Sequence, residues 1–210
     1  METDWQQWAQ SRSTPALAQA LLGAELIVDD CGGLIVETEA YLGVQDRAAH
    51  AYANHRTPRN EALWAEPSTV YVYQMRQYCL LNLNVQAQGT PECILIRALE
   101  PTQGVATMAQ RRQQQGVALA NGPGKLCQAL AVTRADNAIL LGTGRVHITL
   151  DVARPQIIAT GPRIGVPNKG AWTTAALRYW VQDNPYVSGS SRRAAQLHQK
   201  GWHHGTDEHA

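Results

Sequence analysis

The segment from Leu34 to Tyr41 constrains the fold and the chemistry of this chain more than any other. Its apolar start and its alternation predict a β-strand. A period of two puts Glu37, Glu39 and Tyr41 on one face of that strand and the side chains between them on the other. Because glutamate is rarely buried without a partner, this face indicates either a solvated sheet edge or a reaction site.

The residues after this strand favour a turn and a returning loop. Gly43 and Asp46 end the strand, and His50 follows on a connection that can fold back over the two glutamates. The loop that carries His50 can therefore cover the strand face on which the two glutamates lie.

Length and composition are those of an ordinary globular protein. The 210 residues suit one domain, and 44% hydrophobic with 17% charged residues exclude a disordered chain. No apolar run approaches the roughly 18 residues of a membrane span. The first residues also lack the basic start and apolar core of a signal peptide. We expect a soluble, cytoplasmic protein without a membrane partner.

Net charge and cysteine spacing further limit the class of protein. Eighteen basic against seventeen acidic residues give a net charge of +1, so a nucleic-acid site would need local basic clusters. The four cysteines show no Cys-x-x-Cys spacing. This pattern indicates reduced, buried thiols and not a disulfide framework.

Helix and strand signals are mixed along the chain. Thr14-Pro15 is typical of a helix start, because threonine caps and proline tolerates the first helical position; Thr57-Pro58 repeats this signature. We predict helices within 1–13, at 14–23, after 57–60, at 102–115 and from 122, and strands at 25–28, 34–41, 69–73, 78–85, 93–101, 146–150 and 177–181. Asn184-Pro185 ends the folded part, so we expect one domain over 1–190 and a polar tail over 191–210.

Two further strands carry side chains that suit a site. Alternation places Tyr71 and Tyr73 on one face of the strand at 69–73. The strand at 93–101 is nearly continuous in apolar residues and carries Arg97 near its end. A buried arginine usually has a carboxylate partner.

Basic residues near two helix starts are candidates for an anion site. Arg56 and Arg59 flank the start at 57–60, where free amides favour an anion, although a plain helix cap explains them equally well. Gly122-Pro123-Gly124-Lys125 begins another helix and is the best phosphate-binding element in the sequence. It lacks the spacing of a nucleotide P-loop.

Eight short motifs stand in order along the chain. They are Glu-Thr-Glu-Ala-Tyr at 37–41, Asp46-x-x-x-His50, Thr-Pro-Arg-Asn at 57–60, Tyr-Val-Tyr at 71–73, Arg-Ala-Leu-Glu-Pro at 97–101, Asn-Gly-Pro-Gly-Lys-Leu at 121–126, Pro-Arg-Ile-Gly-Val at 162–166 and Asn-Pro-Tyr-Val-Ser at 184–188. Each is weak alone, but together they resemble the alkyladenine (3-methyladenine) DNA glycosylase family, the mammalian type with many bacterial members. The resemblance runs from about residue 14 to 190.

The resemblance implies a fold and a reaction. The fold is a single mixed α+β domain around a curved antiparallel sheet, with surrounding helices, a protruding hairpin that inserts into DNA, and no metal or organic cofactor. The reaction is hydrolysis of the N-glycosidic bond of a damaged purine that has been flipped out of double-stranded DNA, such as 3-methyladenine, 7-methylguanine, ethenoadenine or hypoxanthine. We expect a monofunctional enzyme, monomeric, that leaves an abasic site.

Roles for individual residues follow from the same resemblance. Glu39 is the expected general base, and Arg97 holds the attacking water and keeps Glu39 ionised. The expected pocket for the base consists of Tyr41, His50 and Tyr73, because aromatic rings can sandwich a flat and often cationic base. The expected DNA contacts are Arg59, Arg76, Gln77 and Lys125.

Two positions are assigned by counting along the chain. Counting back from Arg97 lands on Asn84, which we expect at the pocket floor, crowding the amino group of normal guanine; capping of a strand end is the alternative. The family usually has a wedging tyrosine at the hairpin tip. Here counting forward from Tyr73 gives Arg76, counting back from Asn84 gives Gln77, and Tyr78 would require a rebuilt turn. We expect Arg76 to be the wedge.

Two other functions fit parts of the sequence. One is a damaged-DNA-binding protein of the same fold with little turnover. The other is a metal-dependent hydrolase using Glu37, Glu39 and His50, although these residues lack a compact ligand spacing. His203, His204 and His209 lie in a short terminal tail, where solvated histidines are usual, so we predict no metal site there.

Overall fold

The fold is known from a computed structural model, which describes residues 4–189 and 200–203. The helices of this part are α1 (Trp5–Trp8), α2 (Thr14–Ala20), α3 (Val105–Arg112), α4 (Pro123–Ala129) and α5 (Ala171–Thr174). The strands are β1 (Glu25–Val28), β2 (Cys31–Tyr41), β3 (Val70–Met75), β4 (Tyr78–Val85), β5 (Glu92–Gln103), β6 (Val146–Thr149), β7 (Ile158–Gly161) and β8 (Arg178–Val181). Short 3-10 turns cover Gly43–Gln45, Tyr52–Asn54, Glu61–Trp64, Gly116–Ala118 and Arg134–Asp136.

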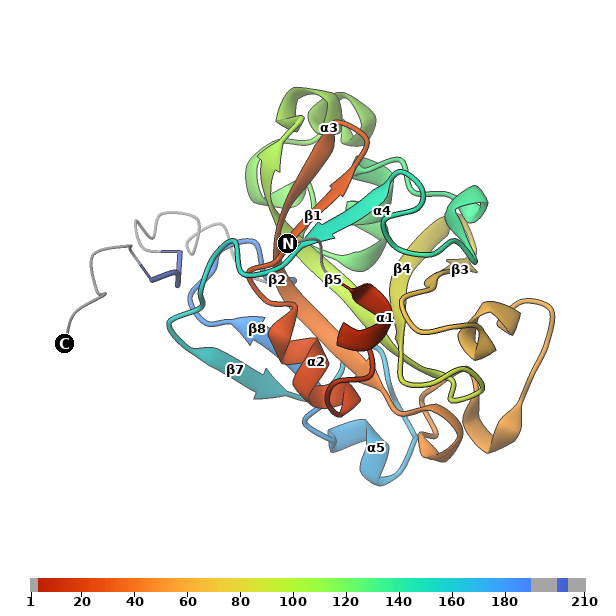
Figure 1. The fold of residues 1–210 in the computed structure, drawn as a ribbon. Coiled ribbons are helices and arrows are strands. Elements are labelled where there is room, and N and C mark those ends of the chain that lie inside the picture. The colour runs from red at the N-terminus through yellow and green to blue at the C-terminus, as the bar shows by residue number, and fades with distance from the viewer. Residues whose placement is uncertain (1–3, 190–199, 204–210) are drawn as a thin grey trace.

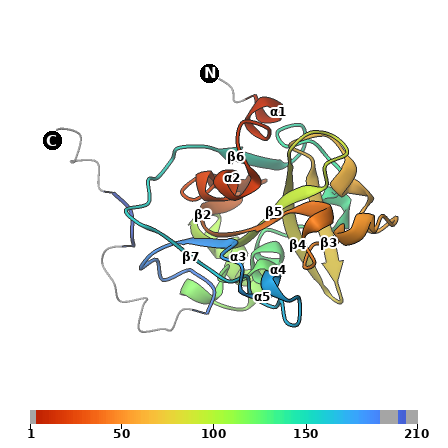
Figure 2. The ribbon, with the colours of Figure 1, turned by 90° about the horizontal axis from the view of Figure 1, so that it is seen from below.

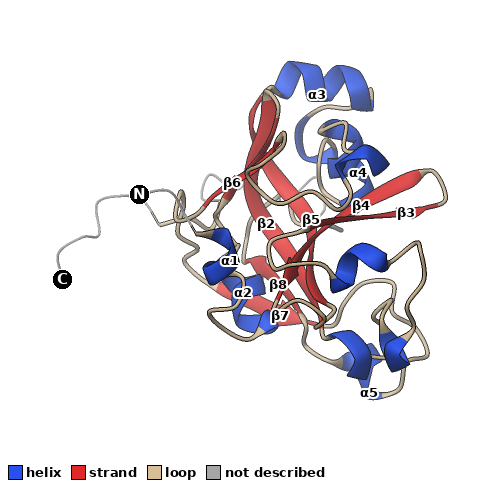
Figure 3. Cartoon of the chain, turned by 45° about the vertical axis from the view of Figure 1, so that its right-hand side comes forward, coloured by secondary structure: helices blue, strands red, loops and turns tan. Residues whose placement is uncertain are grey.

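One antiparallel sheet organises this domain (Figure 1). Within the described ranges its order is β3-β4-β5-β2-β1-β6, with β8 joining β2 and β7 joining β8. The long strands β2 and β5 cross the middle of the molecule, and helices lie on both sides of the sheet (Figure 3). The predicted α+β class, with one domain around a curved antiparallel sheet, is confirmed.

The two faces of β2 meet different partners. On one face the Thr38 hydroxyl donates to the Ala18 carbonyl of α2 over 2.8 Å, which ties the strand to that helix. On the other face Tyr41 bonds Glu39, as a period of two requires. Figure 2 shows α2 on one side of β2, and α3 with α4 on the other. The predicted placement of Glu39 and Tyr41 on one face of the strand, with Thr38 on the other, is confirmed.

The pairing of β2 with β5 is irregular near the acidic residues. Ile35 pairs with Leu99 and Thr38 with Ile96, but Glu37 lies opposite Ala98, so Arg97 has no register partner. At the same place the other edge of β2 changes from β1 to β8. Bulges of this kind bend a strand and redirect a side chain, and they are frequent beside active sites.

Several predicted elements need correction. Thr57-Pro58 does not begin an α-helix, because the Asn60 side chain accepts bonds from the Thr57 amide and hydroxyl and closes a turn; only the 3-10 turn at Glu61–Trp64 follows. The predicted helix at 102–115 is shorter, since β5 continues to Gln103 and Gly104, in the left-handed region, precedes α3. Strand β7 was not predicted.

The C-terminal boundary of the folded part also differs from the prediction. Residues 200–203 return to the domain: Trp202 Nε1 donates to Glu100 over 2.9 Å, and Lys200 forms an ion pair with the same carboxylate. The Asn184 side chain donates both to Glu100 and to the Lys200 carbonyl. The folded part therefore does not end at Asn184-Pro185.

The helices of the described residues are short. None has the length and apolar character that crossing a membrane requires.

Candidate active site

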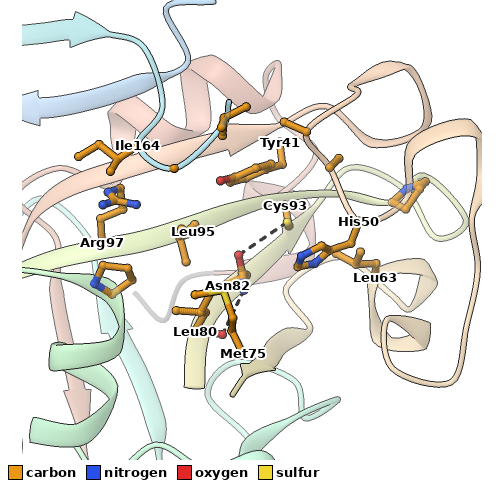
Figure 4. Close-up of a pocket in the computed structure, with 16 residues that line it drawn as sticks. Tyr41, His50, Leu63, Met75, Leu80, Asn82, Cys93, Leu95, Arg97 and Ile164 are labelled. Carbon is orange, nitrogen blue, oxygen red and sulfur yellow. Dashed lines mark hydrogen bonds between the residues drawn. The ribbon is translucent and has the colours of Figure 1, made fainter. Parts of the chain in front are cut away.

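A cavity of about 250 Å³ opens on the face of the sheet opposite α2 (Figure 4). Strands β2, β4 and β5 form its base, and the loops at 48–50 and 162–166 and the start of α4 complete its wall. Its polar side chains are Tyr41, His50, Asn82 and Arg97, and the rest of the lining is mainly apolar. Flat apolar walls with a few directed polar groups are typical of a small-ligand site.

Glu39 lies behind one end of this cavity and is fully buried. Its Oε1 accepts a bond of 2.8 Å from the Ile164 amide and lies 3.2 Å from Arg97 Nη1, while Oε2 accepts a bond of 2.8 Å from the Tyr41 hydroxyl. All three of these partners line the cavity, although Glu39 itself does not. The carboxylate is therefore held by groups that a bound ligand would touch.

The surroundings of Glu39 set its acidity. Burial raises the pKa of Glu39 above the ordinary value of 4.5, and the neighbouring charge of Glu37 adds to this effect. Arg97 opposes burial most strongly, followed by the Ile164 amide and the Tyr41 hydroxyl, all of which favour the ionised form. The result is a carboxylate that binds protons more readily than an exposed one, which suits a group that must accept a proton.

The hydroxyl of Tyr41 stays protonated at neutral pH. Burial raises the pKa of Tyr41 well above the ordinary value of 10, and the adjacent Glu39 carboxylate raises it further. Tyr41 therefore acts as a hydrogen-bond donor to Glu39 and offers the flat side of its ring to the cavity.

His50 and two tyrosines form an aromatic cluster beside the cavity. The ring of Tyr73 lies 4.0 Å from that of His50, centroid to centroid, and His50 Nδ1 lies 2.9 Å from the Tyr71 hydroxyl. Tyr73 is behind His50, in an adjoining hollow, and does not line the main cavity. Although His50 is exposed at its edge, burial lowers its pKa below 6.5, and Arg59 lowers it further, so the ring is neutral at pH 7.

An ion pair that the sequence did not predict supports Tyr41 from outside the cavity. The Arg163 guanidinium lies 4.6 Å from the Tyr41 ring centre and forms two bonds with Asp46, the Nη2–Oδ1 bond measuring 2.9 Å. Both side chains are fully buried. Asp46 and Arg163 stand in two of the sequence motifs, 117 residues apart, but no local pattern joins them.

The pocket asparagine is Asn82, and this corrects the assignment of Asn84. Asn82 lines the cavity; its Nδ2 donates to the carbonyls of Tyr71 and Leu80, and its Oδ1 faces Cys93 Sγ at 3.9 Å (Figure 4). Asn84 lies outside the lining, with its Nδ2 on the Ala62 carbonyl at 2.5 Å. Counting back from Arg97 assumed a fixed length for the loop between β4 and β5, and loops vary in length.

The hairpin of β3 and β4 ends beside the cavity mouth. Met75 pairs with Tyr78, so Arg76 and Gln77 form a two-residue turn, and both are exposed. Met75 follows Tyr71 and Tyr73 on the same face of β3; it lines the cavity and is 51% exposed. Sequence reasoning did not single out Met75, although alternation from Tyr71 and Tyr73 contained the signal.

The remaining predicted cations surround this region. Arg59 is exposed, lies 5.1 Å from the Tyr73 ring centre, and donates to the Gln74 carbonyl over 3.0 Å. Lys125 is exposed on α4, two residues after Pro123 of the cavity lining, and bonds Asn121 over 2.8 Å. Arg56 is paired with Glu61, so it does not join Arg59 in an anion site.

The structure gives no support to the metal-dependent alternative. Among the described residues, no three histidine, cysteine, aspartate or glutamate side chains are grouped as a metal site requires. Glu37 and Glu39 instead face the same guanidinium, that of Arg97. His203 is exposed, and His204 and His209 lie outside the described residues.

Comparison with known proteins shows the family of this chain. The profile of the methylpurine-DNA glycosylase family matches residues 8–185. The chain belongs to the methylpurine-DNA glycosylase family. Its match covers most of the chain, including Glu39 and every residue that lines the cavity. It is therefore a hydrolase of the DNA glycosylase class.

Bacterial relatives span nearly the same length. A protein of Lactiplantibacillus plantarum is 49% identical over 90% of this chain and 93% of its own length. Proteins of Latilactobacillus sakei and Enterococcus faecalis are 43% and 41% identical, each over 91% of this chain and over 93% and 86% of their own lengths. Each of the three bears the name of an inferred 3-methyladenine DNA glycosylase.

Proposed function

We propose that this protein is a monofunctional DNA glycosylase that flips a damaged purine nucleotide out of the duplex and hydrolyses its N-glycosidic bond. The proposed substrates are alkylated or deaminated purines, with 3-methyladenine first because the relatives carry that name. The observation that carries the proposal is Glu39, buried and oriented by Arg97, Tyr41 and the Ile164 amide at the end of an aromatic cavity. The product is an abasic site in DNA.

The chemistry needs both a base and a negative charge. As the bond to the purine breaks, positive charge develops on the sugar, and the attacking water must lose a proton. Glu39 would accept that proton and stabilise the sugar cation. A water in the cavity beside Arg97 Nη1 would lie next to Glu39 and replace one of its present bonds. Arg97 is thus proposed to orient the attacking water and not to act as a nucleophile.

The rings of Tyr41 and His50 in the cavity lining suit a cationic base. A 3-methyladenine or 7-methylguanine nucleotide carries positive charge on the base, and the Tyr41 ring that lines the cavity attracts cations. Neutral His50 adds flat surface without repelling that charge. Base binding would therefore be strongest for bases that alkylation has made cationic.

The decisive test is base release by Glu39→Gln. In a single-turnover assay on methylated DNA, we expect the wild-type chain to release 3-methyladenine and the variant to lose about 10²–10⁴-fold in rate while still binding abasic DNA. Glu61→Gln is the matched control, since it removes an exposed, arginine-paired glutamate away from the cavity. Near-normal release by Glu39→Gln would refute the role of Glu39. Binding of lesion DNA by the wild type without release would favour the alternative, a damaged-DNA-binding protein.

We propose phosphate contacts for Arg59 and Lys125. Both are exposed and lie close to residues of the aromatic cluster or of the cavity wall. Replacing Lys125 by alanine should weaken binding to every duplex about equally and reduce the salt dependence by about one charge. An unchanged salt dependence would count against the phosphate contact.

We propose that Arg76 fills the gap left by the flipped nucleotide, with Gln77 beside it. The tip is exposed, and a planar guanidinium can stack on bases. Arg76→Ala should then slow excision from duplex far more than from single strands, because only a duplex leaves a gap. Met75→Ala is the informative comparison, since Met75 is the exposed apolar side chain at the cavity mouth. Equal losses by Arg76→Ala on lesion and undamaged duplex would reject the wedge.

A further inference from the structure

Glu37 is a fully buried carboxylate that the proposed chemistry does not use. Its Oε1 accepts bonds from Arg97 Nε at 3.1 Å, from Arg178 Nη1 at 3.1 Å and from the Ser188 hydroxyl at 2.8 Å. Its Oε2 accepts a bond of 2.8 Å from the Ser188 amide. A carboxylate with four donors on two oxygens is firmly fixed, because each bond to an ionised group is strong in a buried site.

This fixed carboxylate determines where the Arg97 guanidinium lies. Arg97 directs Nε to Glu37, Nη2 to the Ser188 hydroxyl at 3.4 Å, and Nη1 toward Glu39 at 3.2 Å. A guanidinium is planar, with its donors in a rigid fork. Once Nε and Nη2 are bound, Nη1 has no freedom of its own, so Glu37 and Ser188 set the distance between Arg97 and Glu39.

Arg178 balances the second negative charge. Two carboxylates on one strand face compete for Arg97, since Glu37 and Glu39 both lie within ion-pair distance of it. Arg178 bonds Glu37 and also donates to the Pro162 carbonyl over 3.0 Å, two residues before the Ile164 amide that holds Glu39. Arg178 thereby compensates the charge of Glu37, and Arg97 Nη1 stays directed at Glu39.

We propose that Glu37 is a positioning residue for the reaction: with Ser188 it holds the Arg97 guanidinium against Glu39, and Arg178 compensates its charge. This inference rests on the function proposed for Glu39. A carboxylate that only stabilises the fold would change the fraction of folded protein, whereas a positioning residue changes the rate of the folded enzyme through Arg97.

The test uses the full chain and single-turnover release of 3-methyladenine from methylated duplex DNA. We expect Glu37→Gln to slow release roughly 10²-fold, the size of effect that misplacing a reacting group by about 1 Å produces, with unchanged affinity for abasic DNA. Ser188→Ala should cost less, because the Ser188 amide still reaches Glu37. Asp136→Asn is the matched control: Asp136 is a buried carboxylate bound to Arg145, with no bond to Arg97, Glu37 or Glu39 among the described contacts.

A double variant separates positioning from general stability. Lysine at position 97 lacks the guanidinium fork, so adding Glu37→Gln to the Arg97→Lys variant should slow base release little further. Equal losses in both backgrounds, or a Glu37→Gln rate equal to that of the wild type, would overturn the proposal.

A readout that needs no activity covers the case in which the wild type releases no base. In proton–nitrogen NMR spectra the Arg97 Nε–H, assigned by its disappearance in Arg97→Lys, should exchange slowly in the wild type and rapidly in Glu37→Gln. Lack of base release by the wild type would refute the proposed function. An Arg97 signal unaffected by Glu37→Gln would separately refute the positioning.

Discussion

The buried pair of Asp46 and Arg163 offers a sharp test of how the cavity wall is supported. The Asp46 carboxylate accepts four hydrogen bonds: two from Arg163, one from the Leu42 amide at 3.1 Å and one from the Ala48 amide at 2.9 Å. In Asp46→Asn one oxygen becomes an amide nitrogen, which must face one of these donors. The charge of buried Arg163 is then left uncompensated.

The size of the effect follows from this geometry. Breaking a buried ion pair from one side costs about 3–5 kcal/mol, because an unpaired charge stays buried. A chain of about 200 residues loses roughly 2–4 °C in Tm per kcal/mol, so Asp46→Asn should melt about 6–20 °C below the wild type. Base release by the folded variant should also fall, since the Arg163 guanidinium lies over the Tyr41 ring, which lines the cavity.

Urea unfolding of three variants is the appropriate assay. Asp46→Asn should lower the free energy of unfolding at an unchanged m-value, and Arg163→Met should lower it as well. The double variant should be more stable than Asp46→Asn alone, because methionine leaves no buried cation. A double variant as unstable as the sum of its two changes, or a loss below about 1 kcal/mol in Asp46→Asn, would show that this pair does not act as a buried ion pair.

Three other predictions concern the cavity. Because burial raises the pKa of Glu39, ionisation of Glu39 lowers the stability of the fold as the pH rises through that pKa. Glu39→Gln should therefore have a higher Tm than the wild type at pH 7. A lower Tm would contradict the direction of the pKa shift. For the same reason kcat/KM for base release should fall, as the pH is lowered, at a pH above the 4.5 of an ordinary glutamate, and a profile flat down to pH 4 would exclude Glu39 as the base. Asn82→Ser should change the ratio of guanine-type to adenine-type bases released from an oligonucleotide panel, whereas Asn84→Ser should leave that ratio unchanged; the opposite result would restore Asn84 as the pocket residue.

The sequence predicted those parts of the site that depend on strand alternation. A period of two was enough to place Glu37, Glu39 and Tyr41 on one face, and a buried arginine on an apolar strand was enough to predict a carboxylate partner for Arg97. Both conclusions need only local geometry, and the contacts of Glu39 confirm them.

The sequence could not predict partners that loops bring in from far away. Ile164 and Ser188 stand in two of the motifs, but both meet the acidic strand through backbone amides, which every residue type possesses, so the sequence did not show which carboxylate each would hold. The length of the loop between β4 and β5 decided between Asn82 and Asn84, and loop lengths are free to vary. At 57–60 the Asn60 side chain competes with the helix that Thr57-Pro58 would otherwise begin.

The bonds around Glu37 and Glu39 also determine when during synthesis the proposed catalytic geometry can form. Glu39 is 125 residues from Ile164, and Glu37 is 151 residues from Ser188. A nascent chain in which β5 is complete already contains Glu39 and Arg97, but it has neither the amide that holds the first nor the hydroxyl that holds the second. Contacts across such separations form only after large loops close, and chains fold from the N-terminus as they emerge. The proposed catalytic geometry is therefore completed only after Ser188 has left the ribosome, so a shorter nascent chain should not release bases from DNA.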